Sequence, residues 1–264
     1  MADDVQTSQD WHTYHRVSRS GTYSFLAALP LILIYEILIV FTNGRAVSQV
    51  RVGAEVWLKQ SLALVGSAGL AAFGAIVILV GIGIFYFERR RRIPLLPRYF
   101  AWMILESAVY AVLVAIIVSG LVGAVLTLTL QDGLLSHAAA MAPFGKLQQA
   151  VSSSLRLQVA LSVGAGVYEE LVFRVLLVGG LYLLFRKLLT RRGHAYLAAA
   201  LLGALIFSYV HYLGPLGDAF TIGSFLFRFF FGLVLNILFL LRGFGIAAWT
   251  HALYDIMLVL GIFG

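Results

Sequence analysis

Long apolar stretches dominate this sequence and constrain its fold more than any other feature. A membrane-spanning helix needs about 20 mainly apolar residues. Seven stretches meet that length, at residues 22–42, 61–87, 99–130, 155–186, 195–213, 220–241 and 244–263. Hydrophobic residues fill 61% of the 264 positions and charged residues 12%, a balance that is not typical of a soluble domain. We therefore predict an all-α protein, a polytopic integral membrane helical bundle of about seven transmembrane helices.

The N-terminal residues differ from the rest of the chain because they are polar. Residues 1–20 mix acidic and basic side chains without an apolar run, which predicts a poorly ordered tail and no cleaved signal peptide. Residues 21–264 contain neither a short repeat nor a soluble segment of domain size. We predict that they form a single integral membrane domain.

The stretch at 155–186 is longer than a bilayer requires. As a straight α-helix it would extend about 48 Å, against a hydrocarbon core of about 30 Å. We expect it to tilt, to break near Gly164, Gly166 or the pair Gly179 and Gly180, or to begin at the membrane interface.

Residues 46–60 have the pattern of a shorter amphipathic helix. Val47, Val50, Ala54, Trp57 and Leu58 fall on one helical stripe. The charged residues Arg51, Glu55 and Lys59 lie largely opposite. The pattern predicts a helix that lies on the membrane surface.

Basic residues are placed between the apolar runs. The pI near 9.8 could indicate nucleic-acid binding, but the arginines at 89–92 directly follow an apolar stretch, which is typical of a membrane edge. Lys and Arg in alternate connections number twelve on the side of the N-terminus and five on the other. The sequence therefore predicts a protein of the cell membrane with a cytoplasmic N-terminus, and the lipid bilayer rather than nucleic acid as a partner.

Ionisable residues within apolar runs are the candidate functional residues, because a charge at mid-membrane costs at least about 2.5–3.5 kcal/mol. Glu169, Glu170 and Arg174 lie in one such run. Glu170 and Arg174 are four residues apart, which predicts an internal ion pair. Glu169 points about 100° away from Glu170 on a helix and lacks a full partner, as suits a general base. A packing network without chemistry is the alternative.

Two further spans carry pairs with the same spacing. Phe207 and His211 are four residues apart and share one helix face. His251 and Asp255 repeat this spacing, so the carboxylate can reach one ring nitrogen and leave the other facing a substrate. Each pair alone also fits a structural role. A cavity joining the three spans would suit activation of a water molecule and stabilisation of an oxyanion, as peptide hydrolysis requires.

The three motifs follow one another on separate spans, as Glu-Glu-x-x-x-Arg at 169–174, Phe-x-x-x-His at 207–211 and His-x-x-x-Asp at 251–255. In this order they resemble the CAAX-protease and bacteriocin-processing (CPBP) family, which includes the Ras-converting prenyl endopeptidases and the abortive-infection proteins. The resemblance covers about residues 155–264 and implies that they are the catalytic core of an intramembrane protease. Its substrates would be membrane-associated or lipidated proteins or peptides.

The resemblance also implies roles for single residues. Glu169 would activate the attacking water, and His211 would help to hold it. His251 and Asp255 would occupy the positions that form the oxyanion hole. The supporting members would be Glu170, Arg174 and Phe207.

Asp255 departs from the prenyl-protease pattern, which usually has asparagine at this position. An amide donates hydrogen bonds to an oxyanion, whereas an ionised carboxylate repels it. Asp255 therefore either stays protonated, or orients His251, or helps to bind a metal.

Two histidines and a glutamate also form a familiar zinc ligand set, here Glu169, His211 and His251. The chain has no His-Glu-x-x-His motif, and it has no cysteine for a thiolate site or nucleophile. We expect the glutamate mechanism without a cofactor, with zinc as the alternative. Two other functions stay open: a family relative that acts as a scaffold or regulator without cleavage, and a proton-coupled transporter.

Other polar residues in the spans have structural interpretations. Glu36 and Glu106 each have a tyrosine nearby in sequence that could donate a hydrogen bond, Tyr35 and Tyr110. Arg228 is expected to serve packing or an ion pair, including one with a catalytic carboxylate.

Helix lengths leave one inconsistency. Counted from the predicted cytoplasmic edge, Glu169 and His211 lie about 25 Å along their spans but His251 only about 12 Å. Either one predicted boundary is wrong, or the last span starts below the surface.

Overall fold

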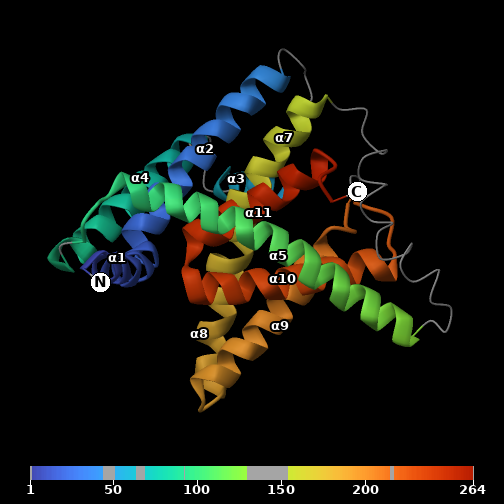
Figure 1. The fold of residues 1–264 in the computed structure, drawn as a ribbon. Coiled ribbons are helices and arrows are strands. Elements are labelled where there is room, and N and C mark those ends of the chain that lie inside the picture. Colours follow the sequence, from blue (N-terminus) through green and yellow to red (C-terminus); the bar gives the residue numbers. More distant parts are fainter. Residues whose placement is uncertain are drawn as a thin grey trace.

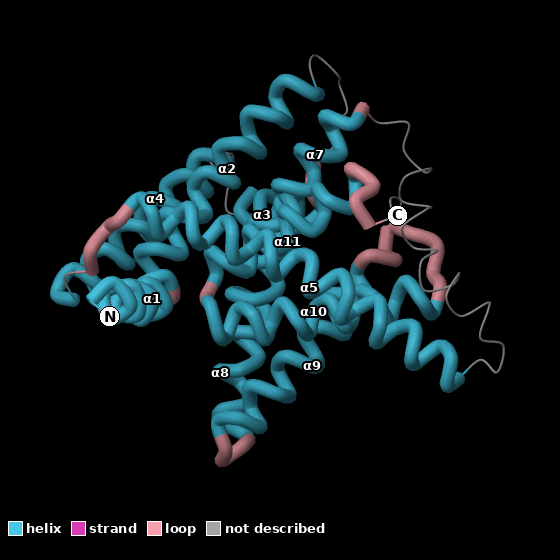
Figure 2. Tube along the Cα trace, in the orientation of Figure 1, coloured by secondary structure: helices cyan, strands magenta, loops and turns pink. Residues whose placement is uncertain are grey.

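The computed structural model describes residues 2–43, 51–63, 69–91, 93–129, 154–214 and 217–263. These residues form helices joined by loops and contain no strand (Figure 2). The helices are α1 (Ala2–Ser18), α2 (Gly21–Asn43), α3 (Gly53–Ala63), α4 (Gly69–Glu88), the 3₁₀ turn η1 (Arg89–Arg91), α5 (Pro97–Thr129), α7 (Leu155–Gly164), the π-helix η2 (Ala165–Val178), α8 (Gly179–Leu188), α9 (Arg192–Val210), α10 (Ile222–Arg242) and α11 (Phe244–Val259). The predicted all-α membrane bundle is confirmed.

Several helices are long and apolar enough to cross a bilayer. Four candidate spans are present among the described residues: Gly21–Thr42, Pro97–Leu128, Arg192–Val210 and Ile222–Arg242. Large apolar side chains on the outer surface are open, including Leu128 at 85%, Phe41 at 81% and Phe87 at 80% exposure. Such a surface is suited to lipid rather than water.

The other three predicted spans differ in detail from the observed helices. The stretch at 61–87 corresponds to α4, which begins at Gly69, while residues 61–63 end α3. The stretch at 155–186 is divided among α7, η2 and α8. The last span is the shorter apolar helix α11.

Helix α11 lies at the centre of the bundle (Figure 1). It packs against α5, η2, α7 and α2. Its buried side chains belong to both hydrophobic clusters of the protein, one shared with α5, α9 and α10 and the other with α2, α3 and α7. The residues on α11 are therefore held between the C-terminal helices α9 and α10 and the N-terminal helices α2 and α3.

The N-terminal residues form a helix in place of the poorly ordered tail that was predicted. Tyr14 on α1 is fully buried and donates a hydrogen bond to Glu106 on α5. Arg242, at the end of α10, donates to the same carboxylate at 2.6 and 2.7 Å. Composition did not reveal this helix, because its hydrogen-bond partners Glu106 and Arg242 lie 92 and 224 residues further along the chain.

Helix α3 also differs from its prediction. The part of the predicted amphipathic helix at 46–50 lies outside the described residues. A helix lying on the membrane surface turns its charged face to water, yet Glu55 on α3 is fully buried and pairs with Arg51 at 2.6 Å. The charged side of α3 therefore packs inward, while Trp57 is 43% exposed.

The corner between α10 and α11 packs against the junction of α1 and α2. Arg242 is buried at 5% exposure, and a Cβ on Gly243 would lie 3.0 Å from the Oγ of Ser24 and 3.6 Å from the backbone oxygen of Arg19. Helix α11 therefore starts beside this junction.

Gly243 should be required at this corner. Its φ of 85° and ψ of 178° fall in a region that is essentially restricted to glycine, so Gly243→Ala should destabilise the fold by about 1–3 kcal/mol. Thermal unfolding of the detergent-solubilised protein measures this loss. Gly180→Ala is the control, since nothing lies within 4 Å of its added Cβ, and equal melting temperatures for the two variants would contradict the prediction.

Candidate active site

The helix that carries the two glutamates has π geometry. It is bounded by the glycine positions at which a break was predicted, because α7 ends at Gly164 and α8 begins at Gly179. Instead of breaking, the chain continues as the π-helix η2, a conformation often found at functional sites. A Cβ on Gly166 would lie 2.5 Å from the Cβ of Ala252, so η2 and α11 are in close contact here.

Glu170 holds the centre of the site. It is fully buried, as is Arg174 at 1% exposure, and their predicted ion pair is present with 3.0 Å between Arg174 Nη1 and Glu170 Oε1. The Arg174 guanidinium lies 4.6 Å from the centroid of the Phe207 ring, a cation–π contact. A charge pair enclosed in this way depends on both partners.

His251 reaches this pair from α11. Its Nδ1 lies 2.8 Å from Glu170 Oε1, so Nδ1–H donates to the carboxylate. Its Nε2 lies 3.5 Å from Asp255 Oδ2 and 4.0 Å from Glu169 Oε2. Glu170 therefore makes the closer contact with the ring and orients it, while Nε2 faces the other two carboxylates.

His211 follows the last turn of α9. Its Nδ1 donates to the backbone carbonyl of Phe207 at 2.7 Å, which leaves Nε2 as an acceptor in the neutral ring. That nitrogen lies 3.9 Å from Glu169 Oε2. Phe207 thus supports the site twice, with its carbonyl and with its ring.

Glu169 faces both imidazoles at similar distances. Separations of 3.9 and 4.0 Å are too long for direct hydrogen bonds but suit a small polar group held between the three side chains. The side chains of Glu169, His211 and Asp255 are 16%, 25% and 26% exposed. The residues predicted to support them, Glu170 and Arg174, are enclosed. The structure brings all seven sequence-predicted residues into one cluster, which consists of Glu169, Glu170, Arg174, Phe207, His211, His251 and Asp255.

The alternative zinc ligands lie in the same cluster. Within the described ranges, however, no group of three or more His, Asp or Glu side chains is arranged to hold a metal ion. The Glu169 carboxylate is flanked by histidine nitrogens beyond hydrogen-bonding distance, as described above.

Some partners were missed by sequence reasoning. The contact of Glu170 with His251 joins residues 81 positions apart, and no local pattern announces it. Arg228 forms an ion pair, but with Asp218 rather than with a catalytic carboxylate. Glu36 receives a hydrogen bond from Tyr168 at 3.2 Å, whereas its sequence neighbour Tyr35 donates to Glu55.

Removal of the buried guanidinium should weaken the fold. Arg174→Met leaves Glu170 charged and enclosed, a change that costs about 3–5 kcal/mol in buried pairs. Lys187→Met is the control, because Lys187 is exposed. Thermal or denaturant unfolding in detergent measures both variants. An Arg174→Met protein as stable as Lys187→Met would show that the pair is not structural.

Comparison with known proteins supports the motif assignment. The model of the type II CAAX prenyl endopeptidase Rce1-like family matches residues 151–257, which include every residue of the cluster. No curated protein and no solved structure matches the chain. The predicted resemblance to CAAX proteases is confirmed at the level of the family: residues 151–257 are similar to the Rce1-like type II CAAX prenyl endopeptidases.

Proposed function

We propose that this protein is an intramembrane endopeptidase that hydrolyses a peptide bond of membrane-associated or lipidated proteins by means of a glutamate-activated water. The observation that carries the proposal is the position of Glu169, whose carboxylate faces the Nε2 atoms of His211 and His251 at 3.9 and 4.0 Å. The Rce1-like family assignment supports a CAAX-type protease.

Glu169 acts as the general base. A water bound between its carboxylate and His211 Nε2 donates one hydrogen bond to Glu169 and a second hydrogen bond to the lone pair of His211 Nε2. Transfer of the first proton to Glu169 accompanies attack of the water oxygen on the scissile carbonyl carbon. Protonated Glu169 then delivers the proton to the leaving amine, which restores the carboxylate.

His251 stabilises the oxyanion. As an imidazolium it donates from both ring nitrogens, Nδ1 to Glu170 and Nε2 to the developing negative charge. Glu170 fixes the ring through its 2.8 Å contact. Asp255, 3.5 Å from Nε2, serves best in its protonated form, in which it can donate as the family's asparagine does.

No metal ion or other cofactor takes part in these steps. Zinc held by Glu169, His211 and His251 is the alternative mechanism. We propose that the protein lies in the cell membrane with its N-terminus in the cytoplasm, as the distribution of Lys and Arg indicates.

The proposal predicts that Glu169→Gln abolishes cleavage while the protein stays folded, since loss of a general base costs about 10²–10⁴-fold. Purified wild type and variant are incubated with a membrane proteome, with and without chelator, and new peptide termini are read by mass spectrometry. Asp10→Asn is the control, a carboxylate on α1 that pairs with Arg98. Termini that persist with Glu169→Gln would refute the role of Glu169, and chelator-sensitive termini would favour zinc.

The two acids beside His251 should respond differently to neutralisation. Glu170→Gln removes the carboxylate that orients His251 and also leaves Arg174 without its partner. Its rate is therefore compared at equal amounts of folded protein, and a loss of about 10–100-fold is expected. Asp255→Asn restores the family's amide and should keep cleavage near the wild-type rate. Rates on a prenylated CAAX peptide measure both. A large loss with Asp255→Asn, together with little loss with Glu170→Gln, would assign the orienting role to Asp255.

A further inference from the structure

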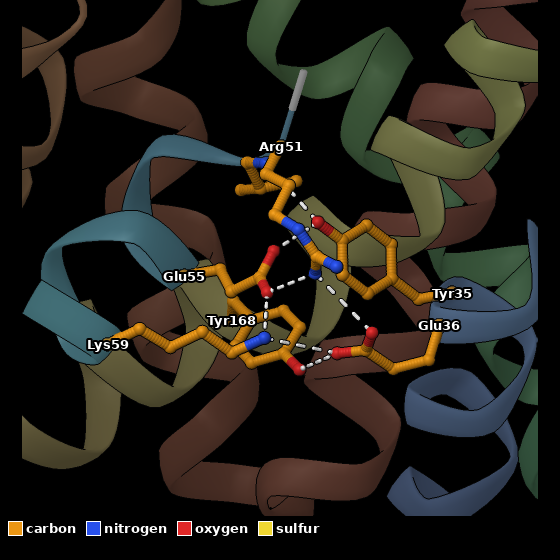
Figure 3. A network of polar contacts seen from close by, with 7 residues as sticks. Tyr35, Glu36, Arg51, Glu55, Lys59 and Tyr168 are labelled. Atoms are coloured by element: carbon orange, nitrogen blue, oxygen red, sulfur yellow. Dashed lines mark hydrogen bonds and ion pairs between the residues drawn. The ribbon is translucent and has the colours of Figure 1, made fainter. Parts of the chain in front are cut away.

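A second polar cluster lies beside the catalytic helix and is not used by the proposed mechanism. Figure 3 shows its side chains converging from three elements. We call it the α3 network, and its members are Tyr35 and Glu36 on α2, Arg51 just before α3, Glu55 and Lys59 on α3, and Tyr168 on η2.

Two cations and two carboxylates neutralise each other in this network. Arg51 Nη1 lies 2.6 Å from Glu55 Oε1 and 3.4 Å from Glu36 Oε2. Lys59 Nζ lies 3.4 Å from Glu36 Oε1 and also pairs with Glu55. Each cation therefore joins α2 to α3, and the burial of Glu55 makes both ion pairs costly to break.

Tyr168 connects the network to η2. Its hydroxyl donates to Glu36 Oε1 at 3.2 Å, and it is 1% exposed. Its ring contacts the Tyr35 ring edge-on, with 5.3 Å between centroids. Tyr35 in turn donates to Glu55 and accepts from the backbone N–H of Val52 at 3.3 Å.

The backbone is also packed closely at this point. A Cβ on Gly164, the last residue before η2, would clash with the Tyr35 ring and lie 2.8 Å from Val52 Cγ2. The start of the π-helix is thus held directly against α2 and the segment before α3. A π-helix as long as η2 is rare in proteins, so contacts outside its own backbone are needed to define its position.

We propose that Tyr168 is a positioning residue for Glu169, and that the α3 network anchors it. Glu169 directly follows Tyr168 in η2, so fixing the buried tyrosine fixes the backbone that aims the carboxylate between His211 and His251. A displacement of about 1 Å at a reacting group can cost about 10²-fold in rate. The anchor comes from α2 and α3, outside the family-matching residues 151–257. This inference rests on the proposed function.

The test is the kinetics of Tyr168→Phe, which removes the hydroxyl and keeps the ring. We expect kcat on a prenylated CAAX peptide to fall about 10–100-fold, with KM changed less than about twofold. Tyr23→Phe is the matched control. Tyr23 is also fully buried on α2 and donates to the Pro94 carbonyl at 2.7 Å, away from η2, so its loss should lower the melting temperature and leave kcat unchanged.

A double-mutant cycle tests the route of the effect. Glu36→Leu removes the acceptor, whereas a glutamine would keep a carbonyl oxygen in its place. If Tyr168 acts through Glu36, then Glu36→Leu should lower kcat as Tyr168→Phe does, and the double variant should reduce kcat no more than the stronger single variant. Unchanged kcat for Tyr168→Phe, an equal loss for Tyr23→Phe, or multiplicative losses in the double variant would overturn the proposal. Wild-type cleavage that does not require Glu169 would refute the proposed function itself. Glu169-dependent cleavage with normal kcat in Tyr168→Phe would refute the positioning role alone.

Discussion

The cost of placing charge within an apolar bundle is the constraint on which the rest of the structure depends. Glu170 shows it most clearly, because a fully buried carboxylate must be compensated. It is compensated twice, by Arg174 on its own helix at 3.0 Å and by His251 on α11 at 2.8 Å. The hydrogen bond from His251 that compensates the buried Glu170 therefore also joins η2 to α11 and orients the His251 ring.

Other buried charges tie the remaining helices together in the same way. The bidentate pair between Arg242 and Glu106 joins α10 to α5, with Tyr14 bringing in α1. The α3 network joins α2 and α3 to η2. Among the described residues, Glu169 instead has only histidines within ion-pair distance. A partly exposed carboxylate without an arginine or lysine partner suits the general base that is proposed for Glu169.

Local spacing accounts for what the sequence could predict. Apolar run lengths gave the helical bundle, and four-residue spacing gave the ion pair of Glu170 with Arg174 and the proximity of His251 to Asp255. Periodicity describes a helix face but does not identify the neighbour that covers it. For this reason three features could not be predicted from the sequence. These are the inward-facing charged side of α3, the helical structure of residues 2–18 in α1, and the contact of Glu170 with His251. The glycines near 164 and 179 predicted a break in the helix, but they did not predict that the residues between them would form the π-helix η2.

The proposed cleavage of a peptide bond by Glu169 and the two histidines is tested most directly by an experimental structure of Glu169→Gln bound to an uncleaved prenylated CAAX peptide. The scissile carbonyl oxygen should lie within hydrogen-bonding distance of His251 Nε2, and its carbon should lie beside residue 169 and His211. A peptide bound with its scissile bond against another face of the bundle would contradict the account.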